Sequence, residues 1–183
     1  AQQEGLRQFS FSESESPYID ISGGFEAYRK ERRSAGSSQI DQTLRKERKI
    51  QRELGPLRFE LHTDDDVAME TLFKWKSEQY QSTGTLDLFS LDWVVEFLQN
   101  LRKKQTNNFS GLLSALYLDD KVIAVHFGIR SRDVLGWWFP SYDHQFSKYS
   151  PGAILLTRVL QEAETAGIER VDLGQGDERY KAS

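Results

Sequence analysis

Apolar positions repeat with two different periods along the chain, and each change of period marks a new element. Strict alternation predicts half-buried strands, and a spacing of three or four residues predicts amphipathic helices. The expected helices cover 38–54, 64–81, 91–103 and a segment that begins at Pro151 and ends at Gly167. The expected strands cover 57–62, 111–118, 121–131, 134–142 and 169–173.

Capping and turn residues support these boundaries. Ser38 and Thr63 are suited to cap the first two helices, and Gly55-Pro56 is a strong stop after the first. Proline fits the first helical turn, because its missing N–H would be unsatisfied there anyway. Residues 143–150, which precede Pro151, are expected to form a polar loop.

The order of these elements predicts the fold class. The three strands between residues 111 and 142 form an antiparallel meander, with Asp119-Asp120 at its first turn. A strand, a helix and a further strand between residues 134 and 173 require a parallel pair. We therefore expect an α/β (α+β) domain with a mixed sheet.

Composition narrows the class of protein. With 183 residues and 21.2 kDa, the chain buries roughly 70% of its unfolded surface on folding, enough for one core. Zero cysteines exclude disulfides and zinc-thiolate sites. A net charge of −4 argues against duplex nucleic acid as a partner. No apolar run reaches the roughly 20 residues of a membrane span, and the N-terminus has no signal-peptide pattern.

Charge is unevenly distributed, which suggests a division of the chain. Residues 1–27 hold five acidic side chains against Arg7 alone, whereas residues 28–53 hold nine basic and four acidic ones. We expect residues 1–37 to be a polar, flexible connection and residues 38–183 to form the folded domain. The basic helix over 38–54 is either a solvated helix packed by one edge or a face that binds an anion or a partner.

Several catalytic motifs are absent. The chain has no G-x-S-x-G elbow and no Walker loop, and its three histidines lack ligand spacing, so no metal site is expected. The aspartates at 64–66 are interpreted as charges at a helix N-terminus. The small residues Ser150, Gly152 and Ala153 surround the start of the last helix, where free N–H groups suit a pyrophosphate; an ordinary helix start is the alternative.

The C-terminal third carries a recognisable motif. Its parts are Tyr149-Ser150-Pro151-Gly152, Leu155-Leu156 and Asp172-Leu173-Gly174-x-Gly176-Asp177-Glu178-x-Tyr180-Lys181. Together with the basic helix and Gly55-Pro56-Leu57, this pattern resembles the GNAT-type acetyltransferase-like family that includes the cellulose-biosynthesis protein CelD. The resemblance covers about residues 40–183.

The resemblance implies a GNAT fold, in which the sheet splays to admit an acyl-thioester such as acetyl-CoA. It places the pyrophosphate of acyl-CoA at Ser150, Gly152 and Ala153. The usual signature, Arg/Gln-x-x-Gly-x-Gly/Ala, is altered, since Ser147 and Ser150 replace its arginine or glutamine and its central glycine. Related FemAB-like peptidyltransferases, which use aminoacyl-tRNA, also lack this signature.

Acyl transfer needs a group that takes a proton from the acceptor and one that protonates the leaving thiolate. Asp177 and Glu178 follow a strand end and are the candidate bases, with helix capping as the alternative. The resemblance suggests Tyr180 as the acid. Lys181 is a candidate for binding an acidic acceptor or a phosphate.

Three further residues of the meander are candidates for substrate binding. They are Tyr142, Asp143 and His126, although a structural sheet histidine is the alternative for His126. Trp137 and Trp138 are expected either in the core or on a face that contacts carbohydrate or an acyl group.

The resulting hypothesis is an acyltransferase-like enzyme of bacterial polysaccharide, cellulose or cell-envelope biosynthesis, located in the cytoplasm. It would transfer an acyl group from acyl-CoA to an amine or hydroxyl of a small-molecule or carbohydrate acceptor. A non-catalytic GNAT-like binding module in a biosynthesis or export complex is the alternative. The resemblance also suggests a longer family chain, with closing strands after Ser183 and a companion GNAT-like half or a dimer partner.

Overall fold

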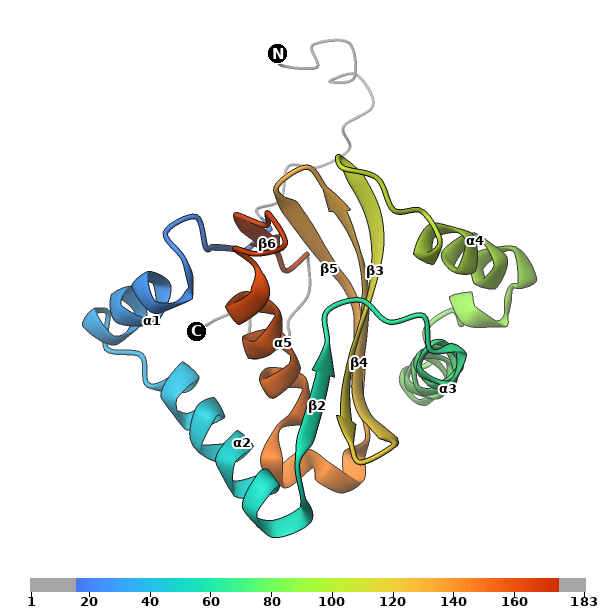
Figure 1. Ribbon diagram of the computed structural model, residues 1–183. Coiled ribbons are helices and arrows are strands. Elements are labelled where there is room, and N and C mark those ends of the chain that lie inside the picture. The colour runs from blue at the N-terminus through green and yellow to red at the C-terminus, as the bar shows by residue number, and fades with distance from the viewer. Residues whose placement is uncertain (1–15, 175–183) are drawn as a thin grey trace.

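Six strands form one mixed sheet in the computed structural model, which describes residues 16–174 (Figure 1). The sheet order is β1-β6-β5-β4-β3-β2. The strands are β1 (Tyr18–Asp20), β2 (Leu57–Glu60), β3 (Phe109–Leu118), β4 (Lys121–Ser131), β5 (Val134–Tyr142) and β6 (Arg170–Asp172). The strands β5 and β6 pair in parallel, and every other neighbouring pair is antiparallel. The predicted mixed sheet is therefore confirmed.

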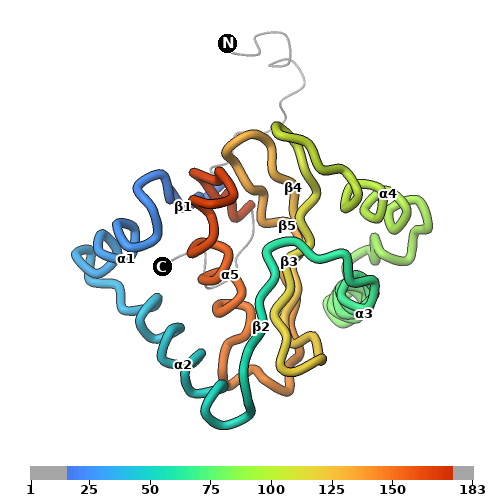
Figure 2. Tube along the Cα trace, viewed as in Figure 1, coloured from blue at the N-terminus to red at the C-terminus, as the bar shows by residue number. Residues whose placement is uncertain are grey.

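Helices cover both faces of this sheet. On one face lie α1 (Phe25–Ser34), α2 (Gln39–Leu54) and α5 (Pro151–Glu162), and on the other lie α3 (Asp66–Thr83) and α4 (Asp92–Arg102) (Figure 1). The short 3-10 helices are η2 (Leu88–Ser90) and η3 (His144–Tyr149). Figure 2 traces the same path, with α2 running beside α5.

Each face of the sheet has its own apolar core. Ile154, Leu155 and Val159 of α5 are fully buried against one face, while Leu72 and Leu98 of α3 and α4 pack against the other. Nine of the ten residues of β3 are buried, because both of its faces are covered. The sheet is thus the central layer of three.

Most predicted boundaries are confirmed to within two residues, but α5 ends at Glu162 and not at Gly167. Two further predictions are corrected. Thr63 does not cap α3: Asp65 accepts the hydrogen bond from the Val67 N–H (2.9 Å), whereas Thr63 accepts one from the Asp65 N–H. The expected loop over 143–150 contains η3, because Asp143 accepts a hydrogen bond from the Gln145 N–H and so starts a helical turn.

Two elements precede residue 38, where the sequence indicated only a polar connection. The strand β1 pairs with β6 on the side away from β5, with Tyr18 opposite Asp172. The helix α1 follows it and has no buried residue. The division of the chain at residue 38 stays a prediction.

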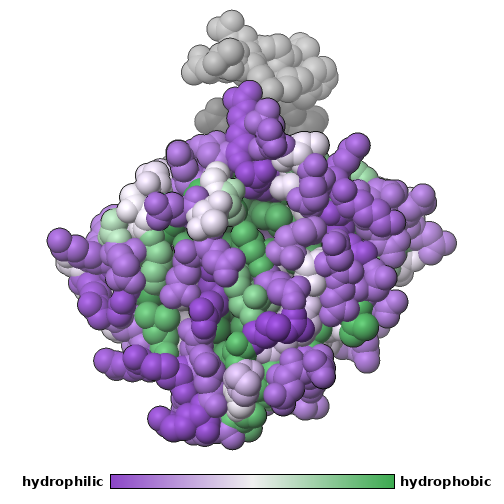
Figure 3. Space-filling view, viewed as in Figure 1, coloured by the Kyte–Doolittle hydropathy of each residue, from purple (hydrophilic) through white to green (hydrophobic). Residues whose placement is uncertain are grey.

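The surface at the β2 edge of the sheet is mostly polar. Figure 3, which looks toward the β2 edge of the sheet, shows mostly polar side chains with apolar ones in the middle of the view. None of the helices between residues 16 and 174 is long and apolar enough to cross a membrane.

Candidate active site

The sheet opens between two of its central strands. The strand β5 pairs with β4 up to Tyr142, but with β6 only from Val134 to Gly136. A change of register lies at the same level, where one extra residue of β5 is accommodated between Gly136 and Phe139. From Trp137 onward, the edge of β5 that faces away from β4 has no paired strand among residues 16–174.

A cleft of about 1110 Å³ occupies this opening. It reaches both sides of the sheet, since residues of α1, α2 and α5 line it on one side and residues of α3 on the other. Its lining mixes aromatic, hydroxyl, amide and charged side chains. A cleft of this size and composition suits a ligand that carries both apolar and polar groups.

The N-terminus of α5 forms one end of the cleft. Ser150 precedes the helix in a left-handed conformation (φ 56°), and Pro151 occupies the first helical position. The Gly152 N–H donates no hydrogen bond among the described residues, and an added Cβ at Gly152 would lie 3.3 Å from the Tyr142 ring. The glycine thus leaves the helix terminus accessible, and the partial positive charge of the terminus favours an anion there.

A lysine from a distant part of the sequence reaches the same point. Lys46 of α2 donates a hydrogen bond from Nζ to Ser150 Oγ over 2.7 Å. Two further contacts fix α2 against this region: the Tyr149 hydroxyl donates to the Glu53 carboxylate over 2.7 Å, and Arg158 forms an ion pair with Glu47. The basic helix therefore packs along α5 and borders the cleft.

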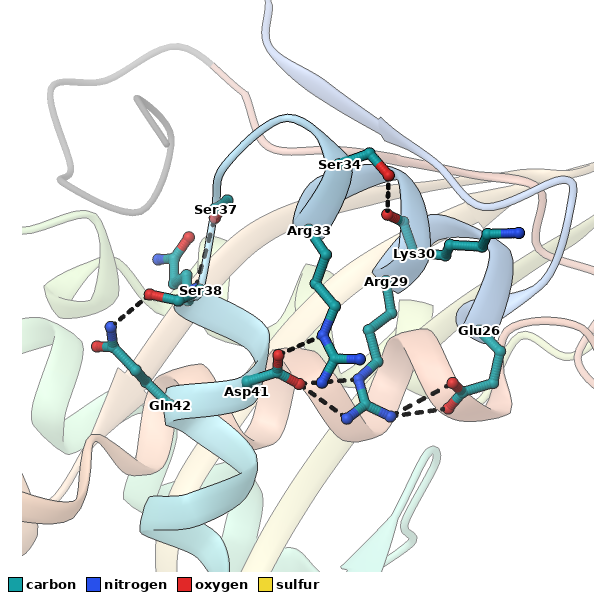
Figure 4. Close-up of polar contacts among 10 residues, drawn as sticks. Glu26, Arg29, Lys30, Arg33, Ser34, Ser37, Ser38, Asp41 and Gln42 are labelled. Carbon is teal, nitrogen blue, oxygen red and sulfur yellow. Dashed lines mark hydrogen bonds and ion pairs between the residues drawn. The ribbon is translucent and has the colours of Figure 1, made fainter.

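The helix α1 closes another side of the cleft and is held there by charge (Figure 4). Arg29 and Arg33 of α1 both donate to the Asp41 carboxylate of α2, over 2.8 Å and 2.5 Å. Glu26 adds a second carboxylate beside Arg29. The two arginine hydrogen bonds lower the pKa of Asp41 to about 2. Tyr28 and Arg32 of this helix line the cleft.

The opposite wall comes from α3 and the free end of β5. Trp75, Glu78 and Gln79 of α3 line the cleft together with Pro140 and Ser141. An aromatic face next to a carboxylate and an amide offers both stacking and hydrogen bonding to a ligand.

Residues 37–182 match the family described as "Acetyltransferase (GNAT) domain". The chain belongs to this GNAT family. The match spans most of the sequence, including α2, the meander and the α5 region that forms the cleft. The GNAT domain that the resemblance implied is thus confirmed. The match does not extend to the group that includes CelD.

Solved structures show the same GNAT-like fold. One is the C-terminal domain of a "Putative Lysylphosphatidylglycerol Synthetase" from Agrobacterium fabrum, with 14% identity and a TM-score of 0.56 over 88% of this chain and 46% of that one. Another is a conserved protein of unknown function from Bacteroides thetaiotaomicron, with 12% identity and a TM-score of 0.59 over 91% and 54%. The chain therefore spans about half the length of these structures. No curated protein matches this chain.

The GNAT domain brings the three predicted cofactor-binding residues together. Ser150, Gly152 and Ala153 lie side by side at the start of α5, and all three line the cleft. Tyr142, a predicted substrate-binding residue, lines it as well and touches the position of Gly152. The roles of these residues stay predictions.

Two other predicted substrate-binding residues have structural partners. Partial burial alone would raise the pKa of Asp143. The ion pair with Lys121 (2.8 Å) and the hydrogen bond from the Gln145 N–H outweigh burial, so the pKa of Asp143 is lowered. His126 is completely buried and stacks on Trp137 with the ring centroids 3.6 Å apart. Trp137 lines the cleft and His126 does not, so His126 does not contact a ligand bound in the cleft. This position agrees with the alternative of a structural sheet histidine.

The remaining predicted site residues lie outside the described part of the chain. These are the candidate bases Asp177 and Glu178, the candidate acid Tyr180, and Lys181.

Several residues of this GNAT domain in or next to the cleft were not predicted, among them Lys46 and Thr157. Lys46 belongs to the basic helix over 38–54, and an anion-binding face was one of the two interpretations of that helix from the sequence. Thr157 lines the cleft from the second turn of α5. No sequence signal distinguishes Thr157 from other helical threonines.

Proposed function

We propose that this protein transfers an acyl group from acyl-CoA to an amine or a hydroxyl of an acceptor. One observation carries the proposal: the free edge of β5 and the accessible N-terminus of α5 border the same cleft. An extended thioester arm fits beside a free strand edge, and an anion fits at a helix terminus. Membership of the GNAT family supports the same activity.

The free edge of β5 supplies hydrogen-bonding groups to this reaction. In acyl transfer, the acceptor nitrogen or oxygen bonds to the thioester carbonyl carbon, the carbon–sulfur bond breaks, and the thiolate leaves and takes up a proton. Backbone N–H groups aimed at the carbonyl oxygen would stabilise the negative charge that develops on it. Residues 137–142 of β5 present backbone groups at the opening with no strand to satisfy them among the described residues.

The proton transfers are assigned to the C-terminal motif. Asp177 or Glu178 would take the proton of the acceptor, and Tyr180 would give one to the thiolate. Lys181 and Tyr142 would bind the acceptor. Of these residues, Tyr142 lies in the described cleft.

For the acceptor, we propose a carbohydrate or another small polar molecule of bacterial envelope or polysaccharide synthesis, in the cytoplasm. The α3 wall supports this class, since Trp75 beside Glu78 and Gln79 matches the stacking and hydrogen bonding that a sugar requires. The resemblance of the C-terminal motif to the CelD-containing family points the same way. One fold neighbour bears the name of a lysylphosphatidylglycerol synthetase, another envelope-related activity, although at 14% identity it supports the fold alone.

A second candidate function is a GNAT-like module that binds a ligand without catalysis. The observation that favours it is the altered signature, with Ser147 and Ser150 in place of its arginine or glutamine and its central glycine. Both serines line the cleft, so the alteration lies at the proposed phosphate end.

Binding and turnover measured together separate these candidates. Calorimetric titration with CoA, acetyl-CoA and longer acyl-CoAs tests binding, and release of free thiol in the presence of sugar amines tests transfer. The acyltransferase proposal expects saturable binding and thiol release. Binding with no thiol release for any acceptor favours the module, and no binding of any acyl-CoA at millimolar concentration contradicts the use of acyl-CoA.

Variants of the C-terminal motif test the assigned roles. Asp177→Asn and Tyr180→Phe are expected to leave binding within about twofold while slowing thiol release roughly 100-fold or more, as is typical for loss of a general acid or base. Unchanged release would remove both residues from the mechanism.

A further inference from the structure

The strand β2 forms one end of the sheet and leaves an edge open. It pairs with β3 on one side, and no other strand among residues 16–174 pairs with it. Figure 3 looks toward this edge and shows apolar side chains in the middle of a mostly polar view. An open edge presents backbone N–H and C=O groups to which a further strand can bind, and natural proteins usually protect such edges.

The side chains along β2 alternate between the two faces of the sheet. Leu57 and Phe59, with Leu61 just after the strand, pack against the core on the α5 face and are only partly buried there. Arg58 and Glu60 lie on the opposite face and form an ion pair with one another. The edge thus has an apolar side and a charged side.

Two contacts hold the charged side chains in place. The guanidinium group of Arg58 lies 3.8 Å from the ring centroid of Tyr117 and pairs with the Glu60 carboxylate. Both charged side chains remain open to solvent in part, since 51% of Arg58 and 34% of Glu60 is exposed. The edge therefore presents one cation and one anion, two positions apart along the strand.

The sequence from Leu57 to Leu61 is complementary to a second copy of itself. Two copies of β2 that pair antiparallel about a two-fold axis at Phe59 place Arg58 of each copy opposite Glu60 of the other. Leu57 then lies opposite Leu61, and the two Phe59 side chains lie opposite one another. Opposite charges and apolar or aromatic side chains directly across a strand pair stabilise the pair.

Other registers of the same pairing are unfavourable. A shift of two residues places Arg58 opposite Arg58, or Glu60 opposite Glu60, and like charges directly opposite one another are destabilising. A shift of one residue turns the apolar side of one copy to the charged side of the other. Parallel pairing in register also aligns like charges. The side chains of this edge therefore select one symmetric arrangement.

The other end of the sheet does not have this property. The outer strand there is β1, which consists of Tyr18, Ile19 and Asp20. Antiparallel pairing of two copies about Ile19 would place Asp20 opposite Tyr18, with no cation across from the carboxylate. Self-complementarity is thus a feature of the β2 edge and not of both outer strands.

We propose that the β2 edge binds a second copy of this chain, so that the two sheets form one continuous sheet across a two-fold axis at Phe59. The same residues serve on both sides of such a contact. Pairing over so few residues buries less than the roughly 1,200 Å² of stable complexes, so we expect a dissociation constant on the order of 10 µM. The cleft is separated from β2 by β3 and β4, so the proposal is independent of acyl transfer.

Sedimentation velocity of the whole chain tests this dimer. Between about 1 µM and about 500 µM, the wild type should change from the 21.2 kDa of one chain to twice that mass. Arg58→Glu places an anion opposite Glu60 of the second copy, and Glu60→Lys places a cation opposite Arg58. Each variant should therefore dimerise roughly 10- to 100-fold more weakly than the wild type.

Combining the two substitutions restores complementary charges. An equimolar mixture of Arg58→Glu chains and Glu60→Lys chains should form a heterodimer with an affinity close to that of the wild type. The double variant Arg58→Glu/Glu60→Lys exchanges the two signs and should form a homodimer again. Glu96→Lys, at an exposed position of α4, makes the same charge change as Glu60→Lys and should dimerise like the wild type. Melting temperatures show whether each variant is folded.

The rescue by mixing distinguishes the β2 edge from other surfaces. A wild type that stays monomeric over the whole concentration range overturns the proposal. So does a dimer that both single substitutions leave intact, or a mixture that does not associate, because the contact then lies elsewhere. If the single variants do not fold, the double variant decides: its dimerisation supports the proposal, and a folded but monomeric double variant overturns it.

Discussion

Two walls of the cleft are stabilised in different ways. The α5 wall is part of the core: Ile154, Leu155 and Val159 are fully buried against the sheet. The α1 wall has no fully buried residue: Phe25 and Tyr28 pack against the same core only in part, and Asp41 with its two arginines attaches the helix to α2. One wall is thus maintained by full burial, which depends little on solvent conditions, and the other by partial packing and ion pairs, and salt and acid weaken the ion pairs.

This difference fits the tasks proposed for the two walls. A phosphate site requires a helix terminus held in one position, and burial of α5 provides that. A wall that adapts to a bound ligand needs contacts that can break one at a time, and the ion pairs between α1 and Asp41 are contacts of this kind. The two walls should therefore respond differently to substitution and to acid.

The largest effect is expected from truncating the α5 wall. Leu155 is completely buried, so Leu155→Ala removes apolar contacts and leaves a cavity, which lowers the free energy of unfolding by about 2–5 kcal/mol. Urea denaturation followed by circular dichroism measures this loss. Leu86→Ala, at a side chain that is 70% exposed, is the control and should change it by less than about 0.5 kcal/mol. Equal losses would show that α5 is not packed as described.

An intermediate effect is expected from acid, through His126. Burial, together with the Lys76 ammonium, lowers the pKa of His126 well below its usual value, and the Gly136 backbone opposes this shift only in part. The folded protein therefore keeps His126 neutral at a pH where the unfolded chain binds a proton. Stability should fall as the pH drops below about 6.5, by roughly 1.4 kcal/mol per pH unit from this group.

The variant His126→Phe isolates that contribution. Phenylalanine keeps an aromatic ring against Trp137 but cannot bind a proton. Between pH 7 and pH 5, the variant should lose less unfolding free energy than the wild type, while the contribution of carboxylates is shared by both. Parallel losses would mean that His126 titrates normally in the folded state.

The smallest effect on global stability is expected at the α1 wall. Asp41→Asn removes the charge that Arg29 and Arg33 share, so α1 should exchange its amide hydrogens faster while α5 does not change. Hydrogen-exchange mass spectrometry of residues 25–34 and 151–162 measures both walls in one experiment. Because the pKa of Asp41 is lowered to about 2, the wild-type attachment is fully present above about pH 4 and should be lost only as the pH falls toward 2. Equal exchange of α1 in variant and wild type would assign its attachment to other contacts.

Local patterns were enough to predict the central sheet and most helices. Apolar runs separated by turn residues predicted β3, β4 and β5, alternation predicted β2, and Gly55-Pro56 marked the end of α2. The cofactor-binding prediction at Gly152 also rested on local features, namely small residues at a helix start. Such features can be recognised in a sequence because they depend on contacts between residues that are only a few positions apart.

Long-range contacts decided what the sequence did not reveal. The strand β1 has only three residues and depends on pairing with β6, more than 150 positions later in the chain. Lys46 and Ser150 are 104 positions apart, so only the packing of α2 on α5 brings them together. The burial of His126 behind Trp137 likewise depends on α3 and α5 covering both faces of the sheet.

A hydrogen-exchange footprint of bound acetyl-CoA tests where the acyl donor binds. We propose that the donor lies between the N-terminus of α5 and the free edge of β5. Saturating acetyl-CoA should slow exchange in residues 147–153 and 137–142 together and leave α4 unchanged. Protection that is absent from both segments, or confined to another part of the molecule, would contradict the claim.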